Sequence, residues 1–198
     1  MKTNQKIKTM VVAALLCGIG IAIPMFMPKV VLGPMSFTLA SHVPVFLAVF
    51  ISPPVAAVVS LITGFGFLLA GFPIVIVLRA FSHLGFALIG ALLLKRRPEM
   101  LCSVGGTLGL GALTAVIHAA CEVLVVTAFF FSGTMGETSY QQGYWYAVFF
   151  MVGAGTLIHS SVDYSISVFV WKHVQSVIHI PVCARVKPLA SGSSGETC

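Results

Sequence analysis

Long apolar runs, separated by short segments that contain proline or polar residues, make up most of this chain. They predict six helices, at about residues 7–27, 41–51, 54–70, 73–94, 103–131 and 144–171. Proline marks several of the breaks, because it lacks the amide donor that a helix interior needs. A helix needs roughly 20 apolar residues to cross a bilayer, so the run at 41–51 is short and predicts a tilted or partly covered helix. We expect an all-α, polytopic membrane protein: one six-transmembrane-helix bundle.

The bundle is expected to form a single domain over residues 1–180. Residues 181–198 are rich in serine and glycine, which predicts a mobile polar tail in the cytoplasm. The apolar run that follows Lys2, Lys6 and Lys8 has no small-residue cleavage site before the next polar stretch. We therefore expect it to be retained as the first helix rather than removed as a signal peptide.

Composition supports a lipid environment. The 198 residues are 58% hydrophobic and only 8% charged, whereas soluble domains are about 25% charged. The net charge of +6 is not arranged as a basic stripe with interleaved aromatics, so a nucleic-acid partner is not expected.

The basic residues instead predict orientation, because lysine and arginine concentrate on the cytoplasmic side of membrane proteins. With the N-terminus inside and six crossings, Lys29 alone falls outside. The cations that then lie inside are Lys2, Lys6, Lys8, Lys95, Arg96, Arg97, Lys172, Arg185 and Lys187. Both ends are therefore predicted to be cytoplasmic.

Ionisable residues inside the apolar runs are the candidates for function, because each is costly in hydrocarbon unless it is paired or faces a cavity. Three pairs have the i,i+4 spacing that places two side chains on one helix face. They are Arg79 with His83, His118 with Glu122, and His159 with Asp163. His42 stands at the head of the short second helix.

Depth separates these pairs. At 1.5 Å per residue, Arg79 lies about 9 Å from the outer end of its helix and Glu122 about 13 Å. Arg79, His83 and Glu122, with His118 as a further candidate, can therefore meet in a pocket open to the outside. Asp163 is about 28 Å down the last helix, which predicts a place near the inner face, solvated or paired with Lys172. His159 and Asp163 are not expected to reach the pocket.

Two roles for Arg79 remain open from the residues. Its guanidinium suits a solute carboxylate, with which it forms two parallel hydrogen bonds. Alternatively it forms an ion pair with Glu122 that ties two helices together, and the two roles are compatible. For His42, His118 and His159 the expected role is a neutral imidazole bonded to backbone or neighbours.

No cofactor, metal or catalytic centre is expected. Zinc needs three or four ligands around one point, and the predicted depths spread the histidines across the bilayer. The pocket contains no evident nucleophile for a membrane enzyme, so we predict that the protein is not an enzyme.

Small residues on the first helix offer a surface for close helix packing. Ala13 with Cys17, and Ala14 with Gly18, have the small-xxx-small spacing that lets two helices approach in lipid. That surface serves either packing within the chain or a membrane partner.

Over most of residues 7–175 the chain resembles the substrate-binding S components of energy-coupling factor (ECF) transporters. The first helix matches the family in the position of its small residues. The middle of the chain is most similar to the niacin-type S components, in the stretches Phe37-Thr38-Leu39-Ala40-Ser41-His42-Val43-Pro44, Phe50-Ile51-Ser52-Pro53, Ala70-Gly71-Phe72-Pro73 and Arg79-Ala80-Phe81-Ser82-His83.

This resemblance implies a subunit of the prokaryotic plasma membrane that captures a small vitamin, with niacin as the best match, and topples in the bilayer to deliver it. The implied partners are a coupling transmembrane subunit, contacted through Ala13, Ala14, Cys17 and Gly18, and two cytoplasmic ATPases. Arg79 would hold the carboxylate. The remaining implied site residues are His83, Glu122 and His42, with Phe72, Tyr144, Trp145 or Tyr146 stacking on the ring.

Other readings stay open at this point. Pantothenate also carries a carboxylate, and cobalamin would need a pocket with a much wider opening. A gradient-driven carrier or a channel could also use an intramembrane arginine and glutamate, and a membrane enzyme would need a nucleophile in the outer pocket.

Overall fold

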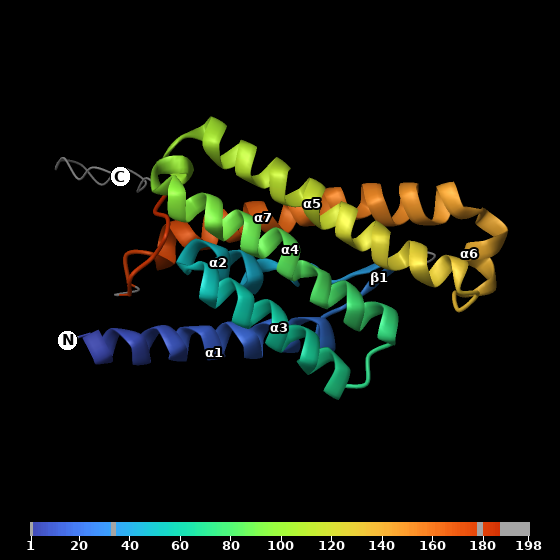
Figure 1. Ribbon diagram of the computed structural model, residues 1–198, viewed down its shortest axis with the longest axis horizontal. Coiled ribbons are helices and arrows are strands. Elements are labelled where there is room, and N and C mark those ends of the chain that lie inside the picture. The colour runs from blue at the N-terminus through green and yellow to red at the C-terminus, as the bar shows by residue number, and fades with distance from the viewer. Residues whose placement is uncertain (1, 33–34, 178–179, 187–198) are drawn as a thin grey trace.

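The computed structural model describes residues 2–32, 35–177 and 180–186. Its long helical segments coincide with the predicted ones to within a few residues (Figure 1). They are α1 (Lys2–Phe26), α2 (Val43–Ile51), α3 (Pro53–Leu69), α4 (Ile74–Arg96), α5 (Val104–Phe131), and η2 (Trp145–Ala154) continuing as α7 (Gly155–Val174). The breaks follow the sequence. Ser52 separates α2 from α3 with an extended backbone and accepts a hydrogen bond from the Val55 amide, and Gly71 makes the α3–α4 turn with a φ of +76°.

Length distinguishes two kinds of helix. Four helical stretches in the described part of the chain are long and apolar enough to cross a membrane: Thr3–Phe26, Ile74–Arg96, Val104–Phe131 and Trp145–Val174. The helix α3 is apolar but has only 17 residues, and α2 has nine. The chain is therefore a polytopic helical membrane protein.

Several short elements were not predicted. The strands β1 (Val30–Leu32) and β2 (Met35–Phe37) form an antiparallel hairpin between α1 and α2, with Val30 opposite Phe37. A short 3-10 helix, η1 (Pro98–Cys102), joins α4 to α5, and α6 (Glu137–Gln142) caps the connection after α5. The segment η2 is a ten-residue π-helix. The sequence therefore predicts the long apolar elements better than the short connecting ones.

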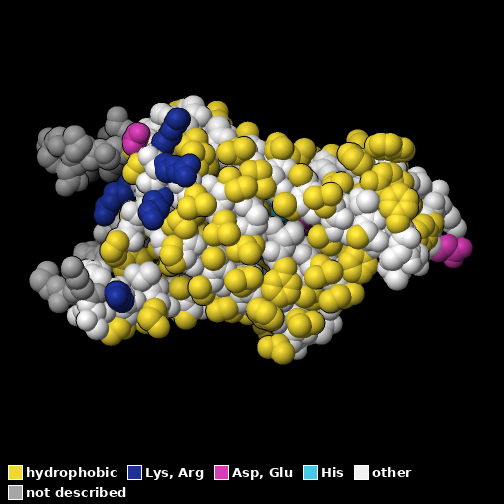
Figure 2. All heavy atoms as spheres, in the orientation of Figure 1, with side chains coloured by type: hydrophobic (Ala, Val, Ile, Leu, Met, Phe, Trp, Pro, Cys, Tyr) yellow, Lys and Arg dark blue, Asp and Glu magenta, His cyan; other side chains and the backbone are white. Residues whose placement is uncertain are grey.

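The surface has the character of a protein in lipid. In Figure 2, hydrophobic side chains cover the length of the visible face, and the lysines and arginines seen there gather at the end where α1 begins and α4 ends. Large apolar side chains stand exposed along the helices, among them Leu69, Leu108, Leu124, Phe131, Phe150 and Phe169. An apolar belt of this extent needs a hydrocarbon environment to be stable.

A buried aromatic cluster packs α2, α4 and α7 together. Its rings are Phe46, Phe50, Phe86, Tyr164 and Trp171. Phe46 lies 5.1 Å from Phe86 and 5.3 Å from Tyr164, between ring centroids. These contacts tie the three helices into one core.

The segment after α7 adds to this packing as far as Val186. The Cys183 amide donates to Ile51 O (2.9 Å), and the Trp171 indole donates to Ala184 O (3.1 Å). Gln175 exchanges two hydrogen bonds with the backbone of Val186. The packed structure thus extends past the expected domain boundary at residue 180, and residues 187–198 of the expected tail lie outside the described residues.

Candidate functional site

The helix α2 begins deep inside the molecule, and one carboxylate holds it there. Asp163 of α7 is fully buried. Its Oδ1 accepts a hydrogen bond from the Ala40 amide (2.8 Å) and its Oδ2 accepts one from the His42 amide (2.9 Å). His42 Nδ1 also lies 3.0 Å from Oδ2. Ala40 adopts a φ of +66°, so the carboxylate stabilises a tight turn that leads into α2.

The prediction that Asp163 lies near the inner face, solvated or paired with Lys172, is therefore wrong. The depth of about 28 Å assumed a helix over residues 144–171, but Trp145–Val174 spans 30 residues, or about 45 Å. That exceeds the roughly 30 Å of hydrocarbon, and the hairpin of α5, α6 and η2 projects beyond the start of α4 (Figure 1). The π-helical segment also departs from the assumed α-helical rise.

Arg79 and Glu122 meet as their predicted depths required. Arg79 Nη2 donates to Glu122 Oε2 at 2.8 Å, and the Thr156 hydroxyl donates to the same oxygen at 2.6 Å. The contact joins α4, α5 and α7. Arg79 Nε is buried and has no hydrogen-bond partner in the described part of the chain, so the guanidinium keeps an unused donor.

Four histidines gather around this ion pair. Measured between ring centroids, His42 lies 4.7 Å from His83, 4.6 Å from His118 and 4.8 Å from His159, and His83 lies 4.9 Å from His118. The expectation that depth would spread these histidines across the bilayer is wrong. It failed because the start of α2 is hydrogen-bonded to Asp163 and because the last helical segment, Trp145–Val174, is longer than predicted.

These groups border a small cavity of about 80 Å³. Five of the predicted site residues line it: Arg79, His83, Glu122, His42 and Phe72. His159 lines it as well, contrary to the expectation that it could not reach. Its ring stacks on Phe37 at 5.4 Å, and its Nε2 lies 3.1 Å from the Ser41 hydroxyl.

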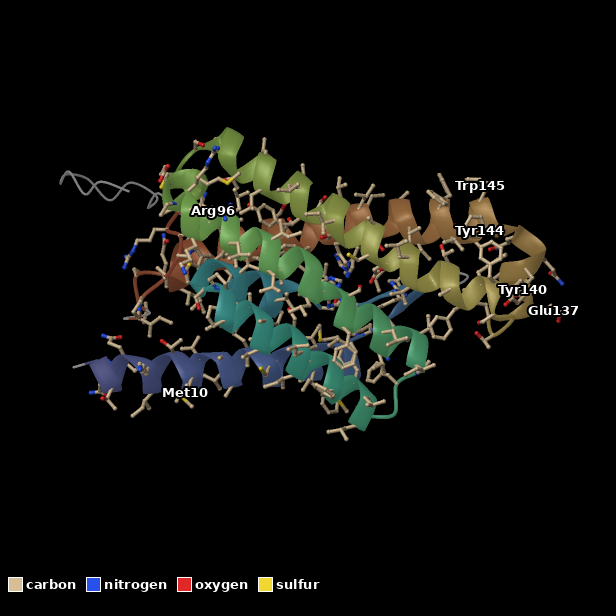
Figure 3. The ribbon with its side chains drawn as sticks, in the orientation of Figure 1. Met10, Arg96, Glu137, Tyr140, Tyr144 and Trp145 are labelled. Carbon is tan, nitrogen blue, oxygen red and sulfur yellow. The ribbon has the colours of Figure 1, made fainter. Side chains whose placement is uncertain are left out.

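The remaining predicted residues lie elsewhere. His118 is fully buried behind the lining. Tyr144, Trp145 and Tyr146 are not among the cavity's lining residues. Figure 3 shows Tyr144 and Trp145 at the projecting end of the α5–η2 hairpin, near Tyr140, and Trp145 is 72% exposed.

Sequence reasoning missed part of the lining. Lys29 is the most informative example: its Nζ lies 4.6 Å from the Phe72 ring centroid, a cation–π contact. It was the one cation predicted outside, and that isolation was a usable signal. The other lining residues that were not predicted are Pro24, Phe37, Thr38, Ser41, Thr63, Phe67, Ile76, Ala80 and Thr156.

The small residues of α1 divide between two faces. Ala13 and Cys17 are buried, whereas Ala14 and Gly18 are exposed. Ala13, Ala14 and Cys17 line an apolar groove between α1 and α3, and a side chain added at Gly18 would meet nothing within 4 Å. The exposed pair leaves room for another helix to approach.

Comparison with known proteins finds a relative that matches most of the chain. The chain is 34% identical to the niacin transporter NiaX of Lactococcus lactis subsp. cremoris (strain MG1363), over 189 residues that make up 95% of this chain and 84% of the relative. No family model matches the chain, and no solved structure matches it.

Proposed function

The chain belongs to the niacin-type substrate-binding (S) components of energy-coupling factor vitamin transporters, and from this membership we propose that it captures niacin in the cavity beside Arg79. The family is one of transporters, not of enzymes, and the chain is a multi-pass protein of the cell membrane.

The observation that carries the proposal is the unused donor of Arg79. Niacin is a pyridine ring with a carboxylate. Arg79 lines the cavity, and its Nε is buried without a partner even though Nη2 is bonded to Glu122. A buried polar group without a partner is costly, so a carboxylate that bonds to Nε would relieve that cost. Lys29 supplies a second positive charge on the same wall.

The size of the cavity supports a small, flat ligand. Drug-sized ligands occupy pockets of about 300–1,000 Å³, against about 80 Å³ here. Cobalamin is far too large for such a space, and pantothenate carries a longer chain. Phe37, Phe67 and Phe72 line the cavity and offer apolar surfaces for a pyridine ring.

Binding of nicotinate to the purified protein tests this proposal. Arg79→Ala should weaken nicotinate binding about a hundredfold, because the charge-assisted hydrogen bond from the guanidinium to the carboxylate and the positive charge beside it are lost together. Wild-type protein should bind nicotinamide, which lacks the negative charge, about a hundredfold more weakly than nicotinate. Isothermal titration calorimetry measures both. Arg96→Ala, at the exposed end of the same helix, is the matched control and should bind as wild type.

Loss of Arg79 also leaves Glu122 buried without its cation, so folding needs a separate check. The double variant Arg79→Ala/Glu122→Gln removes both charges and should fold by size exclusion while still failing to bind nicotinate. Wild-type affinity in either correctly folded variant would contradict the role of Arg79.

We further propose that six segments cross the membrane with both ends in the cytoplasm, and that the chain works with a coupling subunit and two ATPases. The gathering of lysine and arginine at the end where α1 begins supports this orientation. The exposed Ala14 and Gly18 support a helix partner at α1. The toppling of the subunit, expected from the family, would then deliver the bound vitamin.

A further inference from the structure

The four-histidine cluster contains more nitrogen donors than its hydrogen bonds use. His118 is fully buried, yet neither Nδ1 nor Nε2 has a hydrogen-bond partner in the described part of the chain, and His83 Nδ1 has none either. Buried polar atoms are normally paired, and each exception requires an explanation such as an absent water or ion. Three such atoms lie on two adjacent rings. This concentration points to a ligand that the rings hold in common.

The position of Glu122 strengthens this point. Its Oε2 accepts hydrogen bonds from Arg79 and Thr156. Its other oxygen, Oε1, lies 3.4 Å from His118 Nε2 and 3.9 Å from His83 Nε2, too far for good hydrogen bonds. One carboxylate oxygen therefore faces two imidazole nitrogens across a gap.

His42 is arranged as metal-binding histidines are. Asp163 is an acceptor when ionised, so the short contact with its Oδ2 places the proton on His42 Nδ1. That leaves His42 Nε2 with a free lone pair. Histidine ligands almost always donate their other ring N–H to a carboxylate or carbonyl, which fixes the ring and raises its basicity.

We propose that His42, His83 and His118 bind one divalent transition-metal ion, with Glu122 Oε1 as the nearest further donor. The nitrogens offered by these three histidines all lie within 4.8 Å of one another. A tetrahedral zinc site, with bonds of about 2.0–2.1 Å, spaces neighbouring ligands about 3.3 Å apart. Small side-chain rotations close the difference.

The donor set identifies the class of ion. Imidazole favours zinc, cobalt, nickel and copper, whereas magnesium and calcium prefer oxygen ligands. A second grouping, of His42, His159 and Asp163, also has ligand spacing. The Asp163 oxygens already accept hydrogen bonds from Ala40 and His42, so the first grouping is favoured. His42 and His83 also line the cavity proposed for niacin, but the metal proposal does not depend on niacin binding there.

Titration of untagged, chelator-treated protein in nanodiscs with Co²⁺ tests the site. We expect one Co²⁺ per chain, with visible absorption bands typical of low-coordinate nitrogen ligation, and displacement by Zn²⁺. His83→Gln and His118→Gln should each weaken binding at least about tenfold, and Asp163→Asn should weaken it about 10–100-fold by releasing His42. His173→Ala removes an exposed histidine outside the cluster and should bind Co²⁺ as wild type.

A readout on the wild-type protein covers the case in which a variant fails to fold. Bound Zn²⁺ should raise the thermal midpoint, because an ion that binds only the folded state stabilises it, and Mg²⁺ should not. Absence of stoichiometric binding, or equal binding in wild type, His83→Gln and His118→Gln, would overturn the proposal. Nicotinate titration of the chelator-treated protein tests the niacin proposal separately. A negative result for Co²⁺ binding therefore does not affect the result for nicotinate binding, and the reverse also holds.

Discussion

A single carboxylate, Asp163, organises the centre of the molecule. It accepts backbone hydrogen bonds from Ala40 and His42 and lies beside the His42 ring. It thereby joins α7 to the turn that follows the β-hairpin. Buried carboxylates stay ionised only where such bonds replace water, so the turn and the charge depend on each other.

Asp163→Asn should therefore weaken nicotinate binding about tenfold and lower the thermal midpoint. The amide keeps one acceptor oxygen but presents N–H groups where an acceptor is needed, leaving buried donors unpaired at about 1–3 kcal/mol. Calorimetry and thermal unfolding in detergent measure the two effects.

Lys172→Gln serves as the control for that variant. Sequence reasoning offered Lys172 as a partner of Asp163, but the structure gives the carboxylate its bonds from Ala40 and His42 instead. Lys172→Gln should bind nicotinate normally. If it matched Asp163→Asn in its effect, the described role of the carboxylate would be wrong.

At this scale the sequence predicted the site in part. The Arg79–Glu122 contact followed from helix depth, because the two residues were placed about 9 Å and about 13 Å from the outer ends of their helices. The same arithmetic failed for Asp163, because its helical segment Trp145–Val174 is 30 residues long and begins with a π-helical part. Thr156 was missed because a threonine within a helix has no spacing pattern of its own, whereas Lys29 was marked only by being the one cation predicted outside.

Helix packing depends on glycine where side chains of neighbouring helices cross closely. In α5, a Cβ added at Gly111 would lie 2.6 Å from the Tyr164 ring, whereas one at Gly109 would meet nothing within 4 Å. Tyr164 cannot easily move aside, because its hydroxyl donates to Thr107 O at 2.9 Å and its ring packs on Phe46.

Gly111→Ala should thus destabilise the protein by about 1–3 kcal/mol, the usual cost of overpacking. Gly109→Ala, two residues away on the same helix, should be neutral or stabilising by up to about 1 kcal/mol, since alanine has the higher helix propensity. Thermal unfolding of the two variants side by side measures the difference. Equal midpoints would show that the α5–α7 contact is looser than described.

Elements were predictable where an apolar run was long. The six long segments agree with their predicted ranges because proline and glycine mark their ends. The β-hairpin and α6 were not predicted, since strands of three residues and a helix of six carry too few positions for a period to be read. The π-helical part of the last segment contains the same residue types as an α-helix, so the sequence did not indicate it.

The whole molecule presents one surface suited to a membrane partner. Ala14 and Gly18 are exposed on α1, and the groove between α1 and α3 is lined mainly by apolar side chains. Small residues allow backbones to approach in lipid. If the proposed coupling subunit docks here, a large side chain introduced on this face should block transport without affecting binding of the vitamin.

Ala14→Trp and Gly18→Trp should each leave nicotinate affinity of the isolated protein unchanged and reduce ATP-driven uptake at least about tenfold, because a large ring prevents close helix approach. Uptake of labelled nicotinate into proteoliposomes that contain the coupling subunit and both ATPases measures this. Leu124→Trp, on the exposed face of α5, should transport normally. Normal uptake in both α1 variants would place the docking surface elsewhere.

The packed rings Phe46, Phe50, Phe86, Tyr164 and Trp171 begin directly behind the histidines of the cavity, because Phe86 lies 4.7 Å from His118 and 5.8 Å from His83 between ring centroids. A solute held beside His42 therefore meets close-packed side chains on that side of the cavity. If the subunit delivers its vitamin by the proposed toppling, these rings would travel with the solute, and no path through the bundle would have to open.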